Sequence, residues 1–213
     1  LYGENPNKAV RAFTKPFHEA GIQTHMLDRG LNGLRMYPVP ADVRRLMYKV
    51  KHAQGVDITR IFCGLNEVRN IIPSIHYALE AGMIPQATLC ITFSPVHTVE
   101  YYTAIAERLI EAGAPEICLK DMAGVGRPEM LGRLTKAIKE RHPEIIIQYH
   151  GHSGPGLSMA SILEVCENGA DIIDVAMEPI SWGKVHPDVI SVQAMLKDAG
   201  FQVPEINMKA YMK

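Results

Sequence analysis

The segment IIIQYHGH (residues 145–152) is an apolar run that ends in two histidines separated by one glycine. Successive side chains of a β-strand point to opposite faces, so we expect His150 and His152 to project to the same side. A second apolar run, ICL (residues 117–119), is followed directly by Lys120. Two imidazoles on one face at the C-terminal end of a strand provide half of a transition-metal site. The sequence therefore predicts a metalloenzyme.

Apolar runs of the same kind recur along the chain, and most of them follow a glycine that closes an amphipathic window. A glycine suits the left-handed conformation that ends many helices. The six glycines are Gly21, Gly55, Gly82, Gly113, Gly169 and Gly200. The six predicted strands cover residues 22–27, 57–62, 87–93, 117–120, 145–150 and 172–176. Strands that alternate with helices in this way favour an α/β fold with a parallel sheet.

The number of these units favours a barrel. An eight-stranded barrel usually takes about 250 residues, and its chemistry lies at the C-terminal ends of the strands. The chain has 213 residues and starts at Leu1 rather than at a methionine. We therefore expect residues 1–213 to form a partial (β/α)8 TIM barrel of about six βα units, with the first two strands missing. A doubly wound sheet is the competing architecture, but residues 30–33 lack the full glycine fingerprint of a dinucleotide-binding turn.

Composition argues against several classes of partner. Lysine and arginine number 22 and acidic residues 23, so no excess of charge favours nucleic acid or a membrane surface. No apolar run reaches the roughly 18 residues of a membrane span, and we expect neither membrane insertion nor a signal peptide. The four cysteines are scattered, and three lie in apolar runs. This pattern favours reduced thiols in a cytoplasmic protein.

Five short segments carry a family resemblance. They are residues 28–32, 60–70, 94–102 and 118–124, and the pair His150 and His152. In this order they resemble the carboxyltransferase domain of biotin-dependent enzymes, which include pyruvate carboxylase, the α subunit of oxaloacetate decarboxylase and transcarboxylase. The resemblance extends from about residue 1 to about residue 187. It implies a metal-containing (β/α)8 barrel.

The resemblance also implies a set of site residues. In the family, a carbamylated lysine, two histidines and an aspartate of the first strand bind a divalent metal, which we expect to be Zn, Mn or Co. The lysine matches Lys120, the histidines match His150 and His152, and the aspartate's Arg-Asp-x-x-Gln-Ser motif has no counterpart in this sequence. A CO₂ adduct would turn the cationic lysine into an anionic oxygen ligand. Arg29 matches the residue that binds the substrate carboxylate, so Lys120 and Arg29 are the expected catalytic residues.

The implied activity is metal-dependent carboxyl transfer between carboxybiotin and a 2-oxo acid such as pyruvate or oxaloacetate, through a metal-stabilised enolate. The expected partners are a small 2-oxo acid or acyl thioester, a separate biotin carrier domain or subunit, and further copies of the chain in a homo-oligomer. We expect this segment alone to be inactive.

Two alternatives to this activity remain open. The first is a biotin-independent metal-barrel lyase or synthase of the hydroxymethylglutaryl-CoA lyase type. Gly154, at a position where the family normally has a threonine, leaves room for it. The second is a non-catalytic barrel fragment or subunit.

Overall fold

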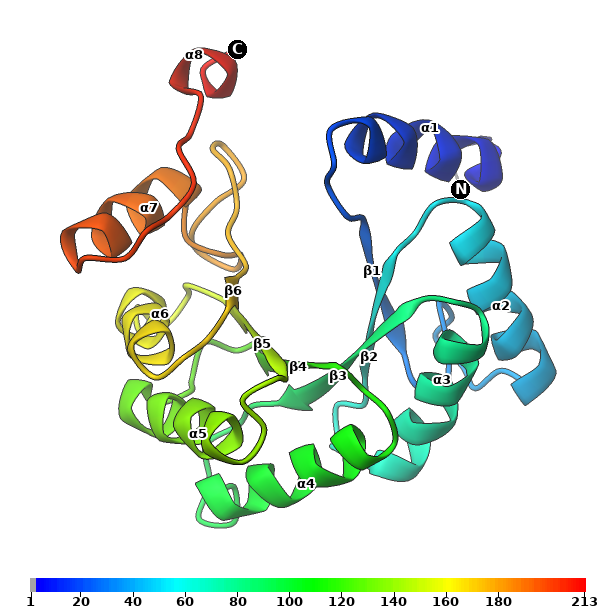
Figure 1. Ribbon diagram of the computed structural model, residues 1–213, viewed down its shortest axis with the longest axis horizontal. Coiled ribbons are helices and arrows are strands. Elements are labelled where there is room, and N and C mark those ends of the chain that lie inside the picture. Colours follow the sequence, from blue (N-terminus) through cyan, green and yellow to red (C-terminus); the bar gives the residue numbers. More distant parts are fainter. Residues whose placement is uncertain (1–2) are drawn as a thin grey trace. The chain divides into compact units, whose positions relative to one another are not determined.

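A computed structural model describes residues 3–213 as helices that alternate with parallel strands (Figure 1). The six strands are neighbours in sequence order, from β1 to β6. They are β1 (His25–Arg29), β2 (Ile58–Phe62), β3 (Ile84–Cys90), β4 (Glu116–Asp121), β5 (Ile146–Gly151) and β6 (Ile172–Ile173). The helices are α1 (Pro6–Glu19), α2 (Ala41–Ala53), α3 (Val68–Glu80), α4 (Val99–Glu111), α5 (Pro128–Arg141), α6 (Ser158–Glu167), α7 (Val189–Asp198) and α8 (Met208–Tyr211). Sequential parallel strands joined through helices are the product of repeated βα units.

Each of the six predicted strand segments overlaps an observed strand, with boundaries that differ by a few residues, and this confirms the α/β fold with about six βα units. All six predicted glycines adopt a positive φ at the ends of the preceding helices. Thr98, which directly precedes α4, accepts a hydrogen bond from the backbone N–H of Tyr101 at 3.2 Å. None of the four cysteines is in a disulfide. Within residues 3–213, no helix combines the length and apolarity needed to cross a bilayer.

The last predicted strand is shorter than expected. Only Ile172 and Ile173 form β6, whereas the prediction extended to Ala176. The backbone of Ala176 pairs instead with the segment that leads into α7, because its N–H donates to the carbonyl of Pro187 and its carbonyl accepts from Val189, both at 2.9 Å. The chain thus forms a loop between β6 and α7 that is closed at its base.

The chain consists of two compact units, each with buried apolar side chains. The first contains residues 1–90, 102–118 and 144–146, and the second contains residues 91–101, 119–143 and 147–213. Buried side chains of the first unit include Tyr48, Ile61, Ile71, Ile75, Leu89 and Leu109. Those of the second include Leu119, Leu131, Leu134, Ile147, Ile162 and Val165. Full burial of one such aliphatic side chain stabilises a fold by about 1.5–3 kcal/mol.

Gly30, directly after β1, allows a close approach between that strand and α3. A Cβ atom at Gly30 would overlap the carbonyl oxygen of Asn70. The carbonyl of Gly30 accepts hydrogen bonds from Ser74 Oγ, at 2.6 Å, and from the Arg44 guanidinium. Gly30 is therefore enclosed by backbone and by buried polar groups that have little room to move.

We expect Gly30→Ala to lower the free energy of unfolding by about 1–3 kcal/mol, because the added methyl group meets backbone rather than a flexible side chain. Gly64→Ala is the matched control, since a Cβ there meets no atom within 4 Å. We expect the control to change stability by less than about 0.5 kcal/mol. Urea unfolding of both variants measures the difference, and equal losses would contradict the close approach.

Candidate functional site

The C-terminal end of β5 brings two imidazoles together. His150 belongs to the strand, His152 follows it directly, and their Nε2 atoms lie 3.2 Å apart. A Cβ atom at Gly151 would overlap the hydroxyl of Tyr149. Glycine is therefore the residue that fits between the two histidines.

A third histidine reaches the same place from the loop between β6 and α7. One ligand nitrogen from each of His150, His152 and His186 lies within 4.8 Å of the others. The His186 ring centroid is 4.3 Å from that of His150 and 5.2 Å from that of His152. Within the described part of the chain, these three form the one cluster of metal-ligating side chains. Sequence reasoning missed His186, because no spacing relates it to the other two.

Two of the three rings have outer hydrogen bonds that fix which nitrogen faces the cluster. His150 Nδ1 contacts Asp174 Oδ2 at 2.6 Å, and His186 Nδ1 contacts the carbonyl oxygen of Gly151 at 2.9 Å. A carbonyl oxygen only accepts, so Nδ1 of His186 carries a hydrogen, and in the neutral imidazole its Nε2 then has the lone pair. The Asp174 carboxylate favours the same tautomer at His150. Outer carboxylates and carbonyls of this kind orient metal-binding histidines in proteins.

The donor set fits a transition metal. Two nitrogens bound to one tetrahedral zinc ion at 2.0–2.1 Å lie about 3.3 Å apart. The observed separation of 3.2 Å between His150 Nε2 and His152 Nε2 is close to that value. Imidazole nitrogens suit Zn, Co, Ni and Cu better than Mg or Ca.

Lys120, at the end of β4, is buried with 3 % of its surface exposed. Its carbonyl accepts the N–H of Ile91 at 2.8 Å, and the carbonyl of the next residue, Asp121, accepts the N–H of His152 at 3.1 Å. The pKa of His152 is lowered by burial and then by the nearby charges of His186 and Lys120. Lys120 therefore lies close enough to act electrostatically on the histidine cluster.

Asp121 has a structural role at the turn that follows β4. Its Oδ1 accepts the N–H of Val125 at 3.0 Å, and its Oδ2 accepts the N–H of Gly126 at 2.8 Å. Burial raises the pKa of this carboxyl, whereas these backbone hydrogen bonds lower it. Both oxygens thus stabilise the turn next to Lys120.

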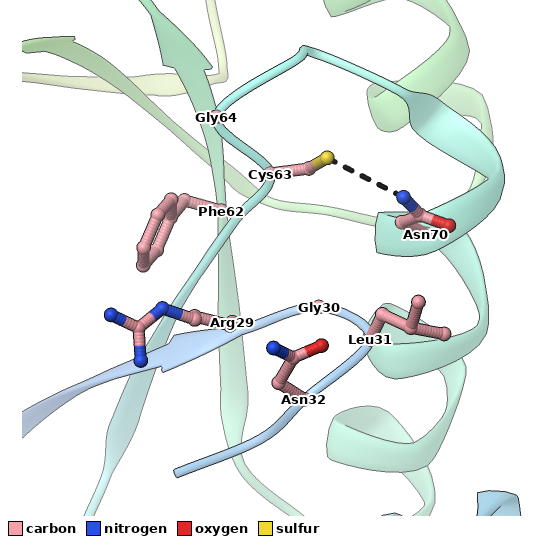
Figure 2. A pocket seen from close by; sticks show the side chains of 8 residues that line it. All are labelled: Arg29, Gly30, Leu31, Asn32, Phe62, Cys63, Gly64 and Asn70. Carbon is pink, nitrogen blue, oxygen red and sulfur yellow. Dashed lines mark hydrogen bonds between the residues drawn. The ribbon is translucent and has the colours of Figure 1, made fainter. Parts of the chain in front are cut away.

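Arg29 lines a separate pocket in the first unit (Figure 2). The pocket lies at the ends of β1 and β2 and is lined by Arg29, Gly30, Leu31, Asn32, Phe62, Cys63, Gly64 and Asn70. The guanidinium lies 5.9 Å from the centroid of the Phe62 ring, and its Nη1 is 3.3 Å from the carbonyl of Arg35. This contact is long enough that a ligand carboxylate could replace it.

Cys63 lies on the other side of this pocket from the Arg29 guanidinium (Figure 2). Its Sγ accepts a contact of 3.5 Å from the side-chain amide of Asn70. An amide N–H is no base, so the pair lacks the group that would activate a thiol nucleophile. Within the sequence-predicted site, His150 and His152 are brought together, Lys120 acts on His152, and Arg29 belongs to the other compact unit.

The residue before Arg29 is a buried acid. Asp28 is 2 % exposed and accepts hydrogen bonds from Tyr48 Oη, at 3.0 Å, and from Thr59 Oγ1. Burial raises the pKa of Asp28 to about 6, although these hydrogen bonds and the charge of Arg44 act in the opposite direction. The strand that carries Arg29 therefore contains a carboxyl that binds its proton more tightly in the folded state.

Comparison with known proteins relates the chain to carboxyl-transferring enzymes. The family model described as HMGL-like matches residues 65–207. A pyruvate carboxylase subunit of Methanocaldococcus jannaschii is 36% identical over 208 residues, which cover 96% of this chain and 36% of that protein. The methylmalonyl-CoA carboxyltransferase 5S subunit of Propionibacterium freudenreichii subsp. shermanii is 34% identical over 199 residues, covering 93% of this chain and 39% of the relative. The chain thus spans somewhat more than a third of the length of these relatives.

A solved structure extends the comparison to the fold. The carboxyl transferase domain from Rhizobium etli pyruvate carboxylase, in complex with pyruvate, matches with a TM-score of 0.86 and 29% sequence identity. The match covers 93% of this chain and 35% of that one. It confirms the predicted TIM-barrel fold class and the predicted family resemblance.

The pKa of Asp28 predicts a pH dependence of stability. An unfolded aspartate loses its proton near pH 3.9, whereas folded Asp28 keeps it up to about pH 6. The folded state therefore binds more protons in this window, and the stabilising contribution is lost as the pH rises through it. In the wild-type protein, we expect the free energy of unfolding to fall by roughly 3 kcal/mol between about pH 4 and pH 7 because of this residue. The Asp28→Asn variant should lack this fall. Urea unfolding across this range measures it. Asp198→Asn, at an exposed acid of α7, should leave the fall unchanged, and an unchanged fall in Asp28→Asn would contradict the assignment.

Proposed function

The chain belongs to the HMGL-like family, in which it is related to the carboxyl transferase domain of pyruvate carboxylase, and on this premise we propose that it transfers a carboxyl group between carboxybiotin and a 2-oxo acid such as pyruvate or oxaloacetate. The observation that carries the proposal is the pair of imidazoles at the end of β5, whose Nε2 atoms lie 3.2 Å apart. The pyruvate in the related Rhizobium etli structure supports a 2-oxo acid as the substrate.

We propose that Lys120, His150 and His152 hold a divalent metal, with Zn, Mn or Co as candidates. A bound cation of this kind would polarise the substrate carbonyl and stabilise the negative charge of an enolate. A buried ammonium group beside imidazoles that hold a cation is unfavourable, since like charges repel. Carbamylation of Lys120 removes this conflict and adds an oxygen donor, which supports the modified form of the lysine.

Arg29 is the proposed binding group for the substrate carboxylate. Its planar guanidinium can donate two parallel hydrogen bonds to a carboxylate, which fixes the orientation of the substrate as well as its position. In the direction of pyruvate carboxylation, the C–N bond to the carboxyl group of carboxybiotin breaks and a C–C bond to pyruvate C3 forms. The proton lost from C3 passes to the ureido nitrogen of biotin. Biotin is supplied by a separate carrier domain or subunit.

A biotin-independent lyase of the hydroxymethylglutaryl-CoA lyase type is the second candidate. The HMGL-like description of the matched family and Gly154 both favour it. The two candidates differ in their need for biotin. Cleavage of an acyl thioester without biotin, together with no biotin-dependent turnover of oxaloacetate, would select the lyase.

Arg29→Lys tests the proposed substrate contact in the full-length protein. Decarboxylation of oxaloacetate with biotin as carboxyl acceptor is followed through pyruvate release. We expect Arg29→Lys to raise the KM for oxaloacetate by roughly 10-fold or more, because lysine keeps the charge and loses the paired hydrogen bonds. Arg133→Lys, at an exposed arginine of α5, is the matched control and should leave the KM unchanged. An unchanged KM in Arg29→Lys would contradict the assigned contact.

Carbamylation of Lys120 is tested by carbon-13 NMR in labelled bicarbonate. We expect one protein carbamate resonance that disappears in Lys120→Arg and persists in Lys136→Arg, a change at an exposed lysine of α5. A wild-type protein without this resonance would contradict the carbamylated ligand and favour the lyase.

A further inference from the structure

We propose that His186 is a third nitrogen ligand, which together with His150 and His152 forms a three-histidine site for a divalent transition metal. The inference rests on the proposed function for the roles of His150 and His152. It adds a ligand that lies outside the motifs of the family resemblance, on the loop between β6 and α7.

The distances bring one nitrogen from each ring into a single coordination sphere. The three ligand atoms lie within 4.8 Å of one another, and the pair from β5 is already at the spacing expected for one tetrahedral ion. The three rings are mutually inclined, since the planes of His186 and His150 meet at 80° and those of His186 and His152 at 90°. Nitrogens that approach one point from different directions suit a tetrahedral ion.

The orientation of His186 is fixed by the residue that lies between the other two ligands. Its Nδ1 donates to the carbonyl oxygen of Gly151 at 2.9 Å, so in the neutral imidazole that binds a metal, Nε2 is the nitrogen with the lone pair. The same hydrogen bond ties His186 to the strand end that carries His150. A ligand with its outer nitrogen bonded to a backbone carbonyl is a common arrangement in metal sites.

The backbone around His186 is also held in place. The N–H of Ser153 donates to the carbonyl of Val185 at 2.9 Å, and the N–H of Trp182 donates to the carbonyl of His186 at 2.7 Å. On the other side, the carbonyl of Pro187 accepts the N–H of Ala176 at 2.9 Å. These backbone hydrogen bonds on both sides of His186 reduce the conformational entropy that the loop would lose when a metal binds.

Asp174 acts as an outer partner of this site. Its Oδ2 contacts His150 Nδ1 at 2.6 Å, and its Oδ1 accepts a hydrogen bond from the side-chain amide of Gln148. Each carboxylate oxygen of Asp174 thus has a hydrogen-bond partner on β5. Three neutral imidazoles leave one tetrahedral position, which a carbamate on Lys120 would fill with the required negative charge, and a fifth position would open for the substrate oxygen during the reaction.

Cobalt binding tests the three-histidine site without any need for catalysis. The full-length protein is stripped with a chelator and titrated with Co²⁺, and its visible absorption is recorded. We expect one strong site with the intense bands of tetrahedral cobalt. His186→Asn should weaken Co²⁺ binding by about 100-fold or more, since loss of a ligand costs at least as much as loss of an outer partner. His76→Asn, at an exposed histidine of α3, is the matched control and should bind as the wild type does.

A second variant keeps the test independent of folding. His186→Cys should retain Co²⁺ binding and gain a near-ultraviolet thiolate-to-cobalt band, which a purely structural residue would not produce. If His150→Asn loses the metal while His186→Asn keeps wild-type affinity and spectrum, the role of His186 as a ligand is overturned, and the metal-binding role of His150 and His152 in the proposed function is retained. If the wild-type protein fails to bind Co²⁺, the role of His186 and the metal site of the proposed function are both overturned.

Discussion

The backbone of Gly151 connects the three imidazoles of the histidine cluster. The hydroxyl of Tyr149 occupies the space that a Cβ atom at Gly151 would need. The alternation of β5 then sends His150 and His152 to the same side, and the Gly151 carbonyl accepts the hydrogen bond that orients His186. One residue thus separates two candidate ligands and positions the third.

The early end of β6 connects the fold to the site. Pairing with β5 aligns Tyr149 with Ile173, so that Asp174 follows within reach of the His150 ring. The chain then leaves the sheet, and the hydrogen bonds between Ala176 and the segment before α7 close a loop that carries His186. A longer β6 would have kept these residues in the sheet. The loss of strand pairing is therefore what brings a third imidazole to the end of β5.

Local patterns in the sequence predicted most of the fold and part of the site. Apolar runs and helix-ending glycines located all six strands, because period-2 alternation and left-handed turns are properties of short segments. The same alternation placed His150 beside His152. His186 could not be found in this way, because its position depends on the path of an irregular loop and on a carbonyl distant in sequence. Local sequence patterns also could not predict where Arg29 lies with respect to the histidines, since Arg29 and the histidines belong to different compact units.

The central claim is that the three imidazoles hold one metal ion. Anomalous diffraction at the zinc edge from crystals grown with zinc tests it most directly. The account predicts a single strong peak about 2.0–2.1 Å from a nitrogen of each of His150, His152 and His186. A zinc peak elsewhere in the protein, with the three imidazoles bonded only to protein and water, would contradict it.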